Sequence, residues 1–153
     1  MTEEDLKNII SKDAIEIGYE AIDKNDAIRR AGKLLLKTGY VEESYVEAMI
    51  QVCEELGPYI VLIPGLAMPH ARPENGAKKL GISILKLKSP VVFGHPENDP
   101  VSLIIALSAP DNNSHLELLS FLSEIFMNEN SLNELLLSNS TNDLYEKIMQ
   151  FAS

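Results

Sequence analysis

The chain has 153 residues, of which 45% are hydrophobic and 24% are charged, a composition typical of a globular protein that buries a core as one domain, residues 1–153. Its formal net charge of −10 argues against nucleic acid and against an anionic membrane surface as partners. The lone cysteine, the acidic segment after Met1 and the lack of an apolar run of about 18 residues predict a cytoplasmic protein without membrane insertion.

The N-terminal part of the chain has helical patterns around one short alternating stretch. Capping and stop signals predict a short helix from Thr2, a longer helix from Asp23 or Asn25 to Gly39, and a third from Glu42–Ser44 to Gly57. Between the first two, the alternation in Ala14–Gly18 predicts a strand. Cys53 falls on the apolar face of the third helix, so we expect it to pack in the core rather than to react.

Strand patterns dominate the middle of the chain. They predict strands over Tyr59–Ile63, Leu80–Leu87 and Val101–Ala109, with Val91–Phe93 as a brief edge strand or a packed connection. The almost continuously apolar Val101–Ala109 is typical of a strand that is buried on both faces. Between these segments, Gly94–Pro100 has the composition of a loop, in which we expect His95 to be solvated.

Helical patterns return after residue 110. They predict a long helix that begins near His115, a short one over residues 131–137 and a last one over residues 141–151. Strands interleaved with helices favour an α/β fold. We expect a mixed, mostly parallel central sheet of about five strands, flanked by helices on both faces.

His70 lies in a stiff segment, Pro64–Pro73, that follows an apolar strand pattern. Prolines on both sides exclude a helix interior and a central strand, so the backbone forms a rigid loop that can present a side chain to a partner. Arg72 adds a fixed positive charge with a planar donor fork suited to carboxylate or phosphate oxygens. Taken alone, such a loop could also carry a histidine with an ordinary surface role.

A second histidine, His115, follows another apolar strand pattern and lies at the start of a helix. If the two strands are parallel neighbours, His70 and His115 emerge at the same edge of the sheet, where ligands gather in open α/β folds. Backbone N–H groups at Asn113 and Ser114 would add the partial positive charge of a helix N-terminus. These features predict a cationic pocket on an acidic protein, and phosphate is the anion that suits it best.

Three chemistries could use such a pocket. A zinc site is disfavoured because the sequence lacks the usual paired histidine or cysteine spacing, and a serine hydrolase is disfavoured because no GxSxG motif is present. We therefore expect neither a metal nor a cofactor. The third option is a nucleophilic histidine, since neutral imidazole can attack a phosphoryl group at cellular pH and a nearby cation can neutralise the phosphoryl oxygens.

The chain resembles enzyme IIA of the bacterial phosphoenolpyruvate-dependent sugar phosphotransferase system, in its mannitol/fructose-type class. The segments that carry the resemblance are Tyr45–Met49, Gly65–His70 and Asn113–Leu116. The length and the order of the predicted elements also match this family. The longer stretch Leu56–Glu74 is most similar to the ascorbate-specific branch.

The resemblance implies a cytoplasmic phosphocarrier. His70 would accept a phosphoryl group from phospho-HPr on Nε2 and pass it to a cysteine of enzyme IIB, which acts with the membrane enzyme IIC in the uptake of ascorbate or a related pentitol or sugar acid. His115 would stabilise the phosphoryl group without accepting it. Mannitol-type members carry an arginine near the position of Gln51–Cys53, where this chain has none, so we expect Arg72 to supply that charge.

Two other interpretations stay open. In a regulatory, nitrogen-type enzyme IIA, phosphorylation of the same histidine would control partner binding rather than transport. The extension Pro69–Glu74 favours the sugar branch over this alternative. In the second interpretation, the chain is an α/β domain whose histidines have no catalytic role.

Overall fold

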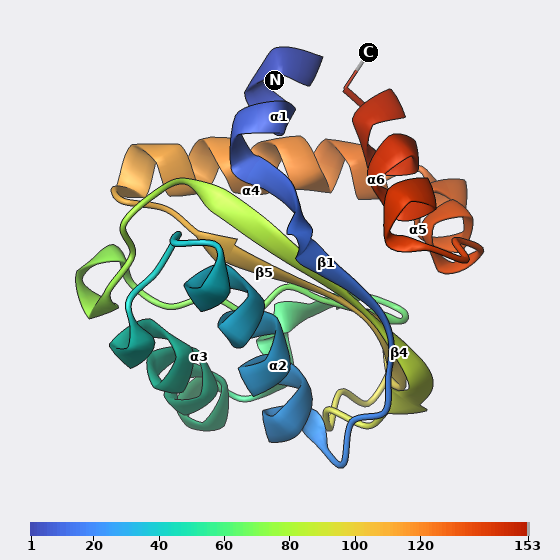
Figure 1. Cartoon of the computed structure of the whole chain (residues 1–153). Helices are drawn as coiled ribbons and strands as arrows, with labels where there is room; N and C mark the ends of the chain where they lie inside the picture. Colours follow the sequence, from blue (N-terminus) through green and yellow to red (C-terminus); the bar gives the residue numbers. More distant parts are fainter. Residues whose placement is uncertain (153) are drawn as a thin grey trace.

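The computed structural model describes residues 1–152 and has helices on both faces of one five-stranded sheet (Figure 1). The helices are α1 (Glu3–Ile9), α2 (Lys24–Lys37), α3 (Glu43–Leu56), α4 (Asn112–Phe126), α5 (Glu129–Leu136) and α6 (Thr141–Gln150). The strands are β1 (Ile10–Tyr19), β2 (Val61–Ile63), β3 (Leu66–Ala67), β4 (Gly81–Val91) and β5 (Val101–Ser108). The predicted α/β class is therefore confirmed.

The sheet is mixed, with the strand order β1-β4-β5-β3-β2. The pairs β1–β4 and β3–β5 are parallel, whereas β4–β5 and β2–β3 are antiparallel. The prediction of a mixed sheet of about five strands is confirmed, but the share of parallel pairing was overestimated. The reason is the short connection between β4 and β5, because a parallel pair needs a crossover of about a dozen residues or more and residues 92–100 cannot supply one.

Two apolar layers cover the sheet. Helices α2 and α3 pack on one face, in a cluster that includes Ile104 and Ala106 of β5. Helices α1, α4, α5 and α6 pack on the other face (Figure 1), in a cluster that includes Leu103, Ile105 and Leu107 of the same strand. Successive side chains of β5 thus alternate between two buried faces, which confirms the prediction of a strand that is apolar on both sides.

Side-chain caps fix the starts of α1 and α2 where the sequence places them. Thr2 accepts the Asp5 N–H, and the Asp5 carboxylate accepts the Thr2 N–H, which completes a capping box for α1. Asp23 caps α2 by accepting the Asp26 N–H. At the other end of α2, Gly39 has a φ of +83°, the left-handed conformation that ends many helices and that favours glycine.

Four details differ from the sequence-based prediction. Pro58 at the first position starts a 3-10 turn, η1 (Pro58–Ile60), so the strand expected from Tyr59 begins only at Val61. A short strand, β3, lies inside the expected histidine loop. The sequence did not predict it, because two residues are too few to give a periodic pattern. Strand β4 continues to Val91 and Phe93 is buried beyond it, so the segment is not a separate edge strand and fits the alternative of a packed connection. Strand β1 begins at Ile10, before the predicted start at Ala14.

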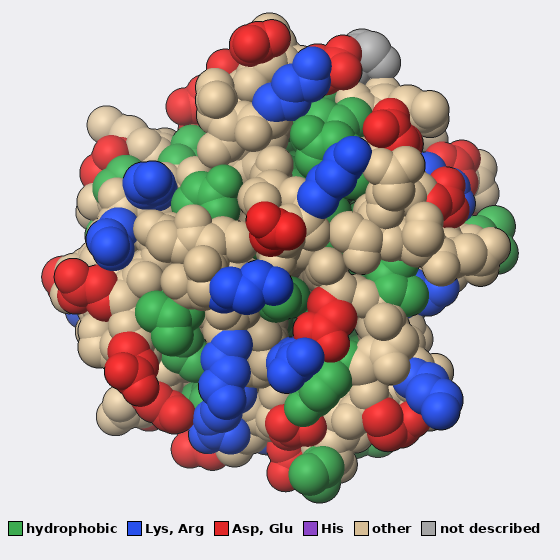
Figure 2. All heavy atoms as spheres, in the orientation of Figure 1, with side chains coloured by type: hydrophobic (Ala, Val, Ile, Leu, Met, Phe, Trp, Pro, Cys, Tyr) green, Lys and Arg blue, Asp and Glu red, His purple; other side chains and the backbone are tan. Residues whose placement is uncertain are grey.

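The face of the molecule shown in Figure 2 carries interspersed acidic and basic side chains, and no histidine is visible on it. Among the described residues, no helix has both the length and the apolar character needed to span a bilayer.

Candidate active site

His70 reaches the sheet edge through the short strand β3. Gly65, with a φ of +88°, turns the chain from β2 into β3, which then pairs in parallel with β5. His115 lies beyond the end of the same β5 strand, in the first turn of α4. The two histidines therefore lie at one edge of the sheet, as predicted, but the prediction was wrong about the strand. The parallel neighbour of β5 is β3, whereas the predicted strand Tyr59–Ile63 corresponds to β2, which pairs antiparallel with β3.

The hydrogen bonding of the His70 ring defines which nitrogen is available for chemistry. Nδ1 lies 2.9 Å from the backbone oxygen of Met68. A carbonyl oxygen can only accept, so Nδ1 carries the proton and donates it, and the neutral ring keeps an unprotonated lone pair on Nε2. This contact lies within the loop itself, because Pro69 alone separates donor and acceptor residues. The loop therefore sets both the tautomer and the orientation of the ring.

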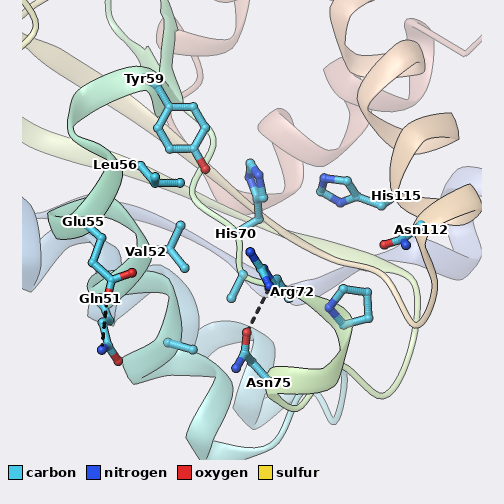
Figure 3. Close-up of a pocket in the computed structure, with 13 residues that line it drawn as sticks. Gln51, Val52, Glu55, Leu56, Tyr59, His70, Arg72, Asn75, Asn112 and His115 are labelled. Carbon is cyan, nitrogen blue, oxygen red and sulfur yellow. Dashed lines mark hydrogen bonds between the residues drawn. The ribbon is translucent and has the colours of Figure 1, made fainter.

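His115 and Tyr59 approach His70 from two other elements. The ring centroids of His70 and His115 are 4.8 Å apart, with the planes tilted by 52°. The Tyr59 ring lies edge-on to His70, with a centroid separation of 6.2 Å and an interplanar angle of 84°. Figure 3 shows His70 between these two side chains. His70 therefore has one aromatic neighbour from α4 and one from η1.

Both histidines favour the neutral form. Burial lowers the pKa of His70 below its ordinary value of 6.5, and the hydrogen bond to Met68 opposes this effect only in part. Burial also lowers the pKa of His115, with a smaller contribution from the neighbouring His70. At neutral pH both imidazoles are therefore uncharged, which is the state that a nucleophilic histidine requires.

The two histidines open into a cavity of about 580 Å³. Its opposite wall is α3, which contributes Gln51, Val52, Glu55 and Leu56, as Figure 3 shows. Gln51 donates a 3.2 Å hydrogen bond to the Glu55 carboxylate along this wall. A single phosphoryl group would fill a small part of such a volume, so the cavity can also admit a side chain of a partner protein.

The site residues predicted from the sequence divide into two groups. Arg72 lines the cavity together with the two histidines, and it forms no ion pair with any of the residues that the structure describes. Asn113 and Ser114 do not line the cavity; Asn112 does. The Ser114 N–H and hydroxyl both donate to the Asp111 carboxylate, at 2.8 and 3.0 Å, because Asp111 caps α4. The expected anion-binding N–H of Ser114 is therefore occupied by a side chain of the protein.

Sequence patterns alone did not reveal two features of the site and its support. No local pattern marks the α3 residues as cavity-lining, and only the family resemblance pointed to this helix, at the position of Gln51–Cys53. His95, which we expected to be solvated, is half-buried, and its Nδ1 accepts the N–H groups of Glu97 and Asn98, at 3.1 and 3.0 Å. This loop supports the hairpin that precedes His70, since the Asn98 side chain donates to Val61. In the described residues, no group of three or more His, Cys, Asp or Glu side chains is placed to hold a metal ion.

This fold, with paired histidines at the sheet edge, is that of an enzyme IIA of the sugar phosphotransferase system. More specifically, the chain belongs to the family described as "Phosphoenolpyruvate-dependent sugar phosphotransferase system, EIIA 2", whose sequence model matches residues 8–150. The resemblance carried by the motifs around His70 and His115 is therefore confirmed at the level of the family.

Individual relatives place the chain within this family. The ascorbate-specific PTS system EIIA component of Shigella boydii is 44% identical over 104 residues, 68% of this chain and 68% of that protein. The solution structure of the mannitol-specific cryptic phosphotransferase enzyme IIA CmtB from Escherichia coli has a TM-score of 0.84 at 36% identity and covers 98% of this chain and 99% of its own.

Two further structures bear on partners and on the regulatory alternative. The Escherichia coli complex of enzyme IIAMTL with phosphorylated enzyme IIBMTL gives a TM-score of 0.80 at 31% identity, with 92% of this chain and 97% of that chain covered. The crystal structure of the nitrogen regulatory protein IIA-Ntr from Neisseria meningitidis has a TM-score of 0.78 at 27% identity, and the match covers 95% of this chain and 97% of that chain.

Proposed function

We propose that this protein is a phosphocarrier in which Nε2 of His70 accepts a phosphoryl group from phospho-HPr and passes it to a cysteine of enzyme IIB. The observation that carries the proposal is the 2.9 Å contact between His70 Nδ1 and the Met68 oxygen. It leaves the lone pair of a neutral imidazole on Nε2, in a cavity that also contains His115 and Arg72.

The transfer needs no external base. The Nε2 lone pair attacks phosphorus, a nitrogen–phosphorus bond forms, and the bond between phosphorus and the donor breaks with its electron pair left on the donor. The ring proton stays on Nδ1, where the Met68 carbonyl stabilises the positive character of the phosphorylated ring. In the second step a cysteine thiolate of enzyme IIB attacks phosphorus, and His70 returns to its neutral form.

His115 and Arg72 stabilise the transferred group in this proposal. The ring centroids of His115 and His70 are 4.8 Å apart. His115 is therefore close enough to donate a hydrogen bond to an oxygen of a phosphoryl group on the His70 ring. Arg72 is a cavity-lining guanidinium without a carboxylate partner among the described residues, so its charge is available to the phosphoryl oxygens. Arg72 takes the place of the arginine that mannitol-type members carry on the corresponding helix, because in this chain Gln51 of α3 lines the cavity instead. No metal or cofactor is required by this chemistry.

The partners follow from the family. The complex of IIAMTL with phosphorylated IIBMTL supports enzyme IIB as the acceptor, and through it a membrane enzyme IIC. The 44% identity to an ascorbate-specific component supports ascorbate, or a related pentitol or sugar acid, as the transported substrate. We expect the protein to act in the cytoplasm, because phospho-HPr must reach it there. We also propose that residues 1–153 form one domain.

A regulatory role of the nitrogen type is the alternative. Its support is the structural likeness to IIA-Ntr at 27% identity, against 44% to the ascorbate-specific relative. The two roles share the phosphorylated histidine and differ in what receives the phosphoryl group. Rapid transfer to an enzyme IIB therefore favours transport, whereas stable phosphorylation that alters the binding of another protein favours regulation.

The proposal is tested by incubating the protein with phosphoenolpyruvate, enzyme I and HPr, followed by intact mass and peptide mapping. We expect one acid-labile, base-stable phosphate on His70 and none on His70→Ala. Circular dichroism of the variant provides the folding control. Incorporation at another residue, or none in the folded wild-type protein, would contradict the proposal.

A further inference from the structure

We propose that Tyr45, in the first turn of α3, is a positioning residue that fixes the His70 loop to strand β5 through its hydroxyl group. Its catalytic consequence rests on the proposed function of His70, whereas the tether itself can be tested without any phosphoryl transfer.

The Tyr45 hydroxyl joins two segments that are distant in the sequence. Its oxygen lies 2.6 Å from the backbone oxygen of Leu107 and 3.1 Å from the backbone nitrogen of Ala71. The Ala71 oxygen lies farther away, at 3.3 Å. A hydroxyl has one proton, so it donates to Leu107, the shorter contact, and accepts the Ala71 N–H on a lone pair.

Leu107 thereby holds the chain on both sides of the nucleophile. Its N–H donates to the Pro69 oxygen at 3.0 Å, directly before His70. Its oxygen reaches Ala71, directly after His70, through the Tyr45 hydroxyl. Since β5 leads into α4 and His115, the same two contacts set the distance between the two histidines. Without Tyr45, the loop would be tied to this part of β5 on one side of His70 only.

Burial gives the tether its strength. Tyr45 is 1% exposed and Leu107 is 0% exposed, so water cannot replace the hydroxyl if it is removed. Burial also raises the pKa of Tyr45 to about 12, which keeps the hydroxyl protonated and able to donate at cellular pH. A buried N–H that loses its acceptor is costly, and the Ala71 N–H has no second acceptor in the described part of the chain.

The test compares Tyr45→Phe with Tyr40→Phe. Both replacements keep a buried ring and remove one hydroxyl, but Tyr40 donates to the Asn8 oxygen at 3.3 Å, away from the His70 loop. We expect Tyr45→Phe to slow phosphoryl acceptance from phospho-HPr roughly 10- to 100-fold, the effect of a misplaced reacting group. Tyr40→Phe should transfer at the wild-type rate.

Two NMR measurements separate positioning from a loss of stability. In the wild-type protein, ¹⁵N spectra should show His70 with its proton on Nδ1, and the Ala71 amide should exchange slowly with solvent. In Tyr45→Phe we expect both tautomers of His70 and fast exchange of Ala71, with neither change in Tyr40→Phe. A Tyr45→Phe protein with unchanged transfer, or with an unchanged tautomer and Ala71 exchange, would overturn the proposal.

The outcomes also separate this inference from the proposed function. If the wild-type protein takes up no phosphate, the phosphocarrier role fails, and the two NMR measurements still decide whether Tyr45 positions His70. If Tyr45→Phe does not fold, the wild-type exchange rate of the Ala71 amide decides. Protection supports the tether, and exchange at the rate of an exposed loop amide overturns it.

Discussion

Phosphorylation of His70 should draw a proton onto His115. In the free protein the pKa of His115 lies below its ordinary value because of burial and, to a smaller extent, because of the neighbouring His70. A phosphoryl group carries roughly two negative charges at neutral pH. On His70, this group would lie beside the His115 ring, whose centroid is 4.8 Å from that of the His70 ring. An anion favours the imidazolium, so the pKa of His115 should rise on phosphorylation.

The ring separation sets the size of this effect. At about 5 Å, each unit of negative charge stabilises an imidazolium by about 0.8 kcal/mol in bulk water and by about 3 kcal/mol at an effective dielectric constant of 20. The half-buried site lies between these limits. For each unit of net negative charge, the ratio of protonated to neutral His115 at a given pH should therefore rise by roughly 4-fold to more than 100-fold, and less at high salt.

The assay is an NMR titration of the imidazole resonances before and after phosphorylation by enzyme I and HPr. The His70→Ala variant, treated identically, provides the control, because its His115 should titrate at the same pH in both samples. A protein that carries phosphate on His70 but shows an unchanged titration of His115 would refute the proposed contact between His115 and the phosphoryl group.

The remaining predictions concern one cation and one thiol. Arg72→Gln should slow transfer roughly fivefold, since an exposed charged contact contributes about 1 kcal/mol, and the gap from wild type should narrow as salt is added; equal rates at low salt would remove Arg72 from the site. Cys53→Ser should transfer at the wild-type rate but lose about 1–2 kcal/mol of unfolding free energy, because Cys53 is 1% exposed and burial raises the pKa of its thiol. Denaturant unfolding and transfer kinetics measure both effects, and slow transfer by the folded serine variant would contradict a purely packing role.

Local signals were sufficient to predict the helices and the longest strands. The caps at Thr2 and Asp23 act within one turn of chain, so they can be recognised from neighbouring residues alone. The almost continuously apolar run Val101–Ala109 predicted β5 in the same way, because a strand that is buried on both faces has few polar positions. The antiparallel pairing of β4 with β5 follows from a short connection, a signal that was present in the sequence but was not used.

By itself, the sequence determined that His70 lies on a stiff loop, that His115 begins a helix and that both belong to an enzyme IIA pattern, since proline geometry, helix caps and short motifs are properties of neighbouring residues. Only the tertiary structure decided the arrangement of the site. It placed β3 rather than β2 beside β5, put Asn112 on the cavity wall in place of Asn113 and Ser114, and brought Tyr45 to Ala71 and Leu107. These contacts join residues that are far apart in the chain, and packing of α3 and β5 around the loop brings them together.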